Sequence, residues 1–411
     1  MHEQIVVTGL GCIGSLGHTP GEFVDRLLEG RTAVGPVQAF DTSGCRAHTA
    51  CTVGDFDAAA YLDPVKLRRV DRIGQFALAA CRLALDDARL RARDAAGGDN
   101  VGIVLGSYTA GCRSAVGYLG SLFKQGALGA SALSFSNTVG NAAASLCALE
   151  FRLRGPNVTV SNKEASSLAA IATAVEFLEE GRARAVVTGG VDDLEVVFYT
   201  THDRFRALAH GDDGGASRPF DRRRNGFVFG EGAFLLVLEP ASAAARRGGR
   251  GHGSIVATSA TASNDGLNAW PREPADLARC MRLALEAAGV EPAQVQFVMA
   301  SANSTALDRT EAAAIAEVFG LMGVPVAAIK GAIGEFGASG AASVMVALEA
   351  LHRRTIPPTV GCDQLDGDLR VDVAPVARPL PARADGGLAL VNSFASGGTH
   401  YCALVGGLPA S

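Results

Sequence analysis

The sequence predicts an α/β protein in which parallel or mixed sheets are covered by helices. Short β-branched runs alternate with longer apolar patterns of helical period along all 411 residues. The second half of the chain repeats the order of elements found in the first half. Glycine is abundant, at 50 residues, and aromatic residues are few, which suits helices that pack closely against sheets.

The first half contains five strand-like runs separated by helical patterns. The strands are expected at residues 5–8, 101–105, 158–160, 185–188 and 234–238. The helical patterns cover residues 21–29, 67–91 and 165–180. Gly181 follows the last of these patterns and suits the left-handed position that commonly ends a helix.

The second half follows the same plan. Residues 295–299 and 325–329 are expected to form strands, and residues 338–353 a helix that stops before Pro357. The similarity indicates a duplication whose turns converge on one site, with generic α/β patterning as the alternative. An Arg- and Gly-rich stretch after residue 240 is the expected join, so we place the two halves at residues 1–245 and 246–411.

Charge and cysteine content exclude several classes of function. The net charge of −5 gives no electrostatic case for binding nucleic acid or an anionic membrane. No apolar run approaches the roughly 20 residues needed to cross a bilayer, and no signal peptide is evident. The nine cysteines are scattered without a CxxC pair, which favours a reducing, cytoplasmic location and gives no spacing typical of a metal site.

The segment SNKEASS, residues 161–167, lies between a predicted strand and a predicted helix. A sharp turn from strand to helix is a common place for an enzyme to present a nucleophile. Here Lys163 and Glu164 occupy that turn. The segment therefore holds either an active site with unusual chemistry or one that has lost its nucleophile.

Several motifs, in order along essentially the whole chain, resemble those of β-ketoacyl synthases. They are the strand at residues 5–11, Gly155-Pro-Asn157, Ser217-Arg-Pro-Phe-Asp221 followed by residues 226–232, Leu307-Asp-Arg-Thr-Glu311, Lys330, Asn392-Ser-Phe394 and Gly397-Gly-Thr399. The resemblance implies the α/β thiolase fold, a five-layered αβαβα arrangement of two duplicated βαβαβαββ halves. It also implies a dimer formed through the N-terminal half.

In that family, a cysteine at the strand-to-helix turn is acylated, and two histidines assist decarboxylation of the malonyl unit. The resemblance places Glu164 at the cysteine position, Ala300 at the first histidine and Glu335 at the second, with Lys330 retained. Ser396 stands where the family has a phenylalanine that gates substrate access. Because a carboxylate is a poor acceptor for a thioester, we expect no catalytic residue at these positions.

The resemblance favours a chain length factor, the non-catalytic subunit of a type II polyketide synthase. Such a subunit would form a heterodimer with a cysteine-bearing ketosynthase and shape the tunnel for the growing chain. The partner would handle the acyl chain on its acyl carrier protein, so no cofactor or metal is expected here. Residues 106–141 correspond to the tunnel region, where the candidates for tunnel or interface contacts are Tyr118, Leu122, Phe123 and Phe135, with core packing as the alternative for each. The intact Ala165-Ser-Ser167 and Gly397-Gly-Thr399 suggest a branch serving highly reduced or polyene chains.

Two other functions stay open. A malonyl-carrier-protein decarboxylase would form a starter unit, but Glu164 would place negative charge beside malonate, and both oxyanion donors are lost. An acid/base enzyme could use Glu164 and Glu335 as a carboxylate pair with separated pKa values. The alternative to that enzyme is that each carboxylate is neutralised structurally, with Lys163 and Lys330 as the expected partners.

Overall fold

The computed structural model describes residues 3–90, 100–211 and 215–409. The first half follows the order βαβαβαββ, confirming the predicted plan. Its elements are β1 (Ile5–Gly14), α3 (Arg72–Asp87), β4 (Val101–Gly106), α6 (Ala142–Phe151), β5 (Asn157–Val160), α7 (Ser166–Glu179), β6 (Ala185–Asp192) and β8 (Gly232–Pro240).

The second half has the same order. Its elements are β9 (Gly253–Ala262), α10 (Pro274–Ala288), β10 (Val295–Met299), α11 (Leu307–Phe319), β11 (Pro325–Ala327), α13 (Ser339–Arg353), β15 (Leu388–Phe394) and β16 (Thr399–Gly406). The short helix α9 (Ala241–Arg246) lies between the halves, within the Arg- and Gly-rich stretch that the sequence indicated as the join.

The remaining helices and strands lie outside the repeated pattern of the two halves. The helices are α1 (Pro20–Leu28), α2 (Pro64–Leu67), α4 (Cys112–Gln125), α5 (Ala132–Phe135), α8 (Val196–Arg204) and α12 (Lys330–Ile333). The short strands β2 (Val34–Pro36), β3 (Thr49–Cys51) and β7 (Phe229–Gly230) form one small sheet, and β12 (Thr355–Ile356) and β14 (Arg378–Pro379) form another. Strand β13 (Asp372–Val373) extends the large sheet beyond β11.

The two halves also share their sheet topology. The strand order is β5-β4-β6-β8-β1 in the first half and β11-β10-β15-β16-β9 in the second. In both halves the first three strands in this order run parallel to one another. The fourth strand pairs antiparallel with the third and with the fifth. The edge strands β1 and β9 pair with each other, from Ile5 opposite Ile255 to Val7 opposite Gly253, so the two sheets join at one edge. This repeated topology confirms the predicted duplicated fold.

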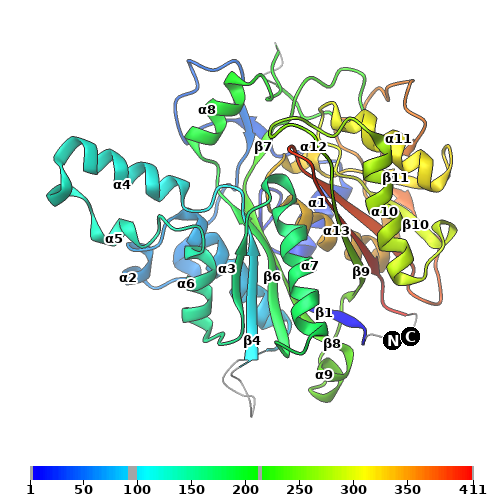
Figure 1. The fold of residues 1–411 in the computed structure, drawn as a ribbon, viewed down its shortest axis with the longest axis horizontal. Helices are drawn as coiled ribbons and strands as arrows, with labels where there is room; N and C mark the ends of the chain where they lie inside the picture. Colours follow the sequence, from blue (N-terminus) through cyan, green and yellow to red (C-terminus); the bar gives the residue numbers. More distant parts are fainter. Residues whose placement is uncertain (1–2, 91–99, 212–214, 410–411) are drawn as a thin grey trace.

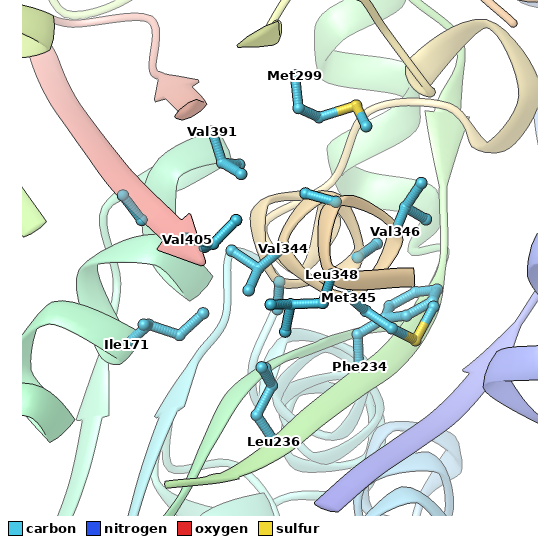
Figure 2. Packing of buried hydrophobic residues seen from close by; sticks show 14 of the residues in the cluster. Ile171, Phe234, Leu236, Met299, Val344, Met345, Val346, Leu348, Val391 and Val405 are labelled. Carbon is cyan, nitrogen blue, oxygen red and sulfur yellow. The ribbon is translucent and has the colours of Figure 1, made fainter. Parts of the chain in front are cut away.

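Three layers of helices enclose the two sheets (Figure 1). Helices α3 and α6 pack on the outer face of the first sheet, and α10 and α11 pack on the outer face of the second. Helices α7 and α13 lie between the sheets. Figure 2 shows Ile171 of α7 and Val344 of α13 between Leu236 of β8 and Val405 of β16. The predicted five-layered arrangement is therefore confirmed.

Small residues allow these layers to approach closely. A Cβ atom at Gly11 of β1 would lie 2.0 Å from the carbonyl oxygen of Ala80 in α3. A Cβ atom at Gly106, at the end of β4, would lie 2.2 Å from the carbonyl oxygen of Ser166, where α7 begins. Both separations are shorter than any allowed contact, so glycine is required where helix and strand backbones meet.

The helix ends differ from the sequence prediction by one residue in most helices and by several residues in α3. The helix expected over residues 67–91 begins at Arg72, because the side chain of Asp71 caps it by accepting from the N–H of Gly74. The same helix ends at Asp87, short of the predicted end at residue 91, which itself lies outside the described residues. The helix expected at 165–180 spans Ser166–Glu179, and Gly181 follows it with a φ of +69°, as predicted. Among the described residues, no helix is long and apolar enough to cross a membrane.

Candidate functional site

The strand-to-helix turn is formed as the sequence predicted, and it buries Glu164. After β5 the chain makes one 3-10 turn over Lys163–Ala165 and enters α7. Lys163 has a φ of +50°, in the left-handed region that costs a non-glycine residue about 1 kcal/mol. Ser166 holds the turn, since its Oγ accepts from the N–H of Asn162 (2.9 Å) and donates to the carbonyl of Lys163 (2.6 Å).

The carboxylate of Glu164 is held by Ser396. The N–H of Ser396 donates to Oε2 at 3.1 Å, and the Ser396 hydroxyl lies 3.1 Å from Oε1. Glu164 is only 1% exposed, and no ion pair to it is found within residues 3–90, 100–211 and 215–409. Burial raises the pKa of Glu164 to about 7, and the negative charge of Glu335 raises it as well, against smaller opposing effects of Lys163 and the Ser396 N–H.

Lys163 does not pair with Glu164, which corrects the expectation that it would neutralise this carboxylate. Its Nζ instead donates to the carbonyl of Leu267, to Oδ1 of Asn268 (2.9 Å) and to Oγ of Ser396 (3.4 Å). The turn directs the two neighbouring side chains to different partners. Lys163 therefore influences the pKa of Glu164 through space, without a salt bridge.

Glu335 is paired with Lys330, as expected. Nζ of Lys330 lies 2.8 Å from Oε2 of Glu335, and the two side chains are 2% and 1% exposed. The same carboxylate accepts from Nδ2 of Asn303 (2.7 Å) and from Oγ of Ser339 (3.0 Å). Lys330 also donates to the carbonyl (3.0 Å) and hydroxyl (3.1 Å) of Ser301. A buried ion pair with this many hydrogen bonds needs no substrate to satisfy it.

Asn303, rather than Ala300, meets Glu335. Ala300 packs in the hydrophobic cluster of the second half, and its N–H donates to the carbonyl of Ala327. Asn303 is positioned by Asp308, whose Oδ1 accepts from its N–H at 2.8 Å, and burial raises the pKa of Asp308 to about 6. Sequence reasoning missed Asn303 because residue spacing was counted back from Asp308. The available signal was that Asn303 is the only amide side chain in residues 300–306.

Tyr108 and Asp192 complete the site, and sequence reasoning identified neither. Asp192, at the end of β6, accepts from the N–H groups of Tyr108 (2.7 Å), Thr109 (2.8 Å) and Ala338 (3.0 Å). It thereby joins the segments that precede α4 and α13. Burial raises the pKa of Tyr108, and the negative charges of Glu164, Asp192 and Glu335 raise it further. The turns of both halves therefore converge on one site, as the duplication predicted.

The four tunnel candidates lie apart from these carboxylates, on helices α4 and α5. Both helices extend away from the rest of the molecule (Figure 1). The ring of Tyr118 packs 5.5 Å from that of Phe135, and Leu122 is half-buried. Phe123 is 83% and Phe135 55% exposed, so core packing within this chain does not explain either residue. Their role at a tunnel or interface stays a prediction.

No metal site is evident in the part of the chain that the structure describes, where no three His, Cys, Asp or Glu side chains are grouped to hold an ion. The expectation that the protein needs no cofactor remains a prediction. The chemistry available at the site is that of two buried carboxylates, one paired with a lysine and one held by a serine.

Comparison with known proteins establishes the family. The pattern described as "Beta-ketoacyl synthase, N-terminal domain" matches residues 2–244, and "Beta-ketoacyl synthase, C-terminal domain" matches residues 252–363. The chain belongs to the β-ketoacyl synthase family. This is a family of acyltransferase-type condensing enzymes, and its thiolase fold is the one described above.

The relatives include 3-oxoacyl-acyl-carrier-protein synthases and putative polyketide β-ketoacyl synthases. The chain is 31% identical to 3-oxoacyl-acyl-carrier-protein synthase 2 of Synechocystis sp., covering 96% of each sequence. It is 32% identical to the putative polyketide β-ketoacyl synthase 1 of Streptomyces cyaneus, covering 92% of this chain and 93% of the other. Among solved structures, the ishigamide ketosynthase/chain length factor is similar with a TM-score of 0.91, 29% identity and coverage of 99% and 100%.

Proposed function

We propose that this chain is a chain length factor, a non-catalytic subunit that pairs with a cysteine-bearing ketosynthase and shapes the tunnel for its growing chain. The observation that carries the proposal is that Glu164 is buried and hydrogen-bonded at the position of the nucleophile. The position that presents the nucleophile holds a buried carboxylate whose oxygens accept hydrogen bonds from Ser396. No thiol stands at the turn.

Condensation needs a nucleophile that holds the acyl group as a thioester and groups that stabilise the enolate formed by decarboxylation. Glu164 offers an oxygen nucleophile, which would form a labile anhydride in place of a thioester. Glu335 carries negative charge at the position of an oxyanion donor, and that charge is already matched by Lys330 at 2.8 Å. The site therefore lacks both requirements, and its residues stabilise one another.

Helices α4 and α5 form an exposed arm, and the surface of this arm is evidence that a partner subunit binds there. Among the described residues, the side-chain hydrogen bonds from α4 to the rest of the molecule come from its first three residues, including Arg113 to Asp193 (2.6 Å) and Ser114 to Asp71 (2.6 Å). None of its 14 residues is buried. Large apolar side chains are exposed along the arm, at Val116, Leu119, Phe123, Leu128, Phe135 and Val139. An exposed apolar surface of this kind is typical of a protein interface.

The nearby sheet edge supports the same conclusion. Strand β5 pairs only with β4 among the described strands, which leaves one side of it open. An open edge beside an apolar arm suits a partner that covers both. We infer that this partner is the ketosynthase, and that an acyl carrier protein delivers the chain to it during elongation of a polyketide or polyene.

The structure also gives one observation in favour of the acid/base alternative. With a pKa raised to about 7, Glu164 could exchange a proton near neutral pH. The two functions differ in what they require of Glu164. A structural Glu164 can be replaced while product formation by the complex continues, whereas a catalytic Glu164 cannot.

The test is co-expression with a cysteine-bearing ketosynthase, followed by mass spectrometry of the carrier-bound products. We expect a one-to-one complex that elongates the chain with Glu164→Ala at close to the wild-type rate, and no elongation when the partner's cysteine is replaced. Complete loss of elongation with the Glu164→Ala complex intact would establish the acid/base function. Conversion of malonyl- to acetyl-carrier protein by the isolated chain would establish the decarboxylase instead.

A further inference from the structure

Lys163 and Glu164 are adjacent in sequence, and their strongest contacts are with two different loops, although Lys163 also reaches Oγ of Ser396 at 3.4 Å. Glu164 binds the loop of residues 395–398 through Ser396, at 3.1 Å from both its N–H and its hydroxyl. Lys163 binds the loop of residues 263–270 through the carbonyl of Leu267 and Oδ1 of Asn268. The turn that could present a nucleophile thus contacts both loops that lie over it.

The two loops also bind each other. The N–H of Gly397 donates to the carbonyl of Ala269 (2.9 Å), and the N–H of Ser263 donates to the carbonyl of Gly398 (2.9 Å). Gly397 and Gly398 have φ values of +93° and +87°, and a Cβ atom at Gly397 would lie 2.7 Å from the carbonyl oxygen of Leu267. The loops therefore meet backbone to backbone, and Ser396 lies at their junction.

Burial does little to hold the tip of the first loop. The side chain of Leu267 is 82% exposed, and Asn268 is exposed as well. The position of the tip therefore depends on its polar contacts, of which Lys163 makes two. Beneath the loops, by contrast, Glu164 is 1% and Ser396 8% exposed, so solvent is excluded from these two side chains.

We propose that Lys163 and Glu164 act as a clamp that holds the loops of residues 263–270 and 395–398 closed over the turn. The closed loops keep an acyl thioester on a phosphopantetheine group from reaching the turn, so that the acyl group is loaded only onto the partner. This inference rests on the proposed function, because a closed site is useful only if another subunit does the chemistry.

The test is hydrogen–deuterium exchange of the complex, read by mass spectrometry. In Glu164→Ala we expect residues 395–398 to exchange about tenfold faster, the effect of losing one or two hydrogen bonds. In Lys163→Met we expect the same increase at residues 263–270, and in the double variant at both loops. Glu164→Gln is the matched control, because its amide can accept from the Ser396 N–H and donate to the Ser396 hydroxyl. We expect it to exchange like the wild type.

Unchanged exchange of both loops in the double variant would overturn the clamp, as would an increase spread equally over core strands such as β8. A second measurement reports access directly. In Glu164→Cys, alkylation of the new thiol by iodoacetamide, resolved by peptide mapping, should become about tenfold faster when Lys163→Met is added. Equal rates would also refute the clamp. Neither result affects the elongation assay, so failure of the clamp and failure of the partner role are distinguishable.

Discussion

The titration of Glu164 gives the most specific prediction from this structure. Replacing Glu164 by Gln keeps the shape of the side chain and its bonds to Ser396, but removes the charge. The charged groups around it are Lys163 on the same turn, Glu335 before α13, and Lys330, which pairs with Glu335. Tyr108, on the segment after β4, stays protonated because burial raises its pKa. The variant therefore changes one ionisation without changing the packing.

The magnitude follows from the pKa of Glu164, which burial raises from 4.5 to about 7. A carboxyl group with a raised pKa stabilises the folded state at low pH, and that contribution is lost as the pH rises through about 7. The difference between 4.5 and about 7 corresponds to about 3 kcal/mol. We therefore expect Glu164→Gln to be more stable than the wild type by up to about 3 kcal/mol at pH 8, with the difference vanishing towards pH 4.5.

The assay is denaturant unfolding of wild type and variant at several pH values between 5 and 8.5. Other buried carboxyl groups titrate in the same range, since burial raises the pKa of Glu311 to about 7 and that of Asp193 to about 6. Both proteins therefore lose stability with rising pH, and only their difference reports Glu164. If the two curves stay parallel, Glu164 is ionised throughout and the account of its burial is wrong.

Three further predictions concern the arm, the ion pair and the lost nucleophile. Phe123→Asp should weaken the complex with the ketosynthase at least tenfold in a binding assay without lowering the melting temperature. Leu321→Asp, at a site that is 71% exposed near α11, is the control and should change neither the affinity nor the melting temperature. Lys330→Met should lower the free energy of unfolding by about 3–5 kcal/mol, because it leaves Glu335 buried and unpaired. Adding Glu335→Gln should restore part of the lost free energy of unfolding, and an equal loss in the double variant would contradict the pairing. Glu164→Cys, combined with a partner lacking its own cysteine, should give no elongation products by mass spectrometry, because Glu335 still occupies the place of an oxyanion donor; restored elongation would show that the nucleophile is the only missing part.

Local sequence patterns were sufficient for much of the fold. Hydrophobic periodicity located the strands and the helix at Ser166–Glu179, and Gly181 ended that helix with the positive φ expected of it. The prediction failed at the start of α3, because the cap formed by Asp71 decides where the helix begins. Periodicity reports which face of a helix is buried, whereas its first residue depends on a single hydrogen bond.

The sequence by itself determined the family, the duplicated plan and the absence of a thiol at the turn, because each of these is a matter of residue type and order. It also offered Lys330 as a candidate partner for the carboxylate of Glu335, five residues away on the same short segment, and the structure confirms this pair. The tertiary structure alone decided that Glu164 binds Ser396, 232 residues away, and that Lys163 reaches Asn268, 105 residues away. It also brought Asn303 to Glu335, 32 residues away. Contacts between distant segments depend on how the two halves pack, and no local pattern encodes which side chains then meet.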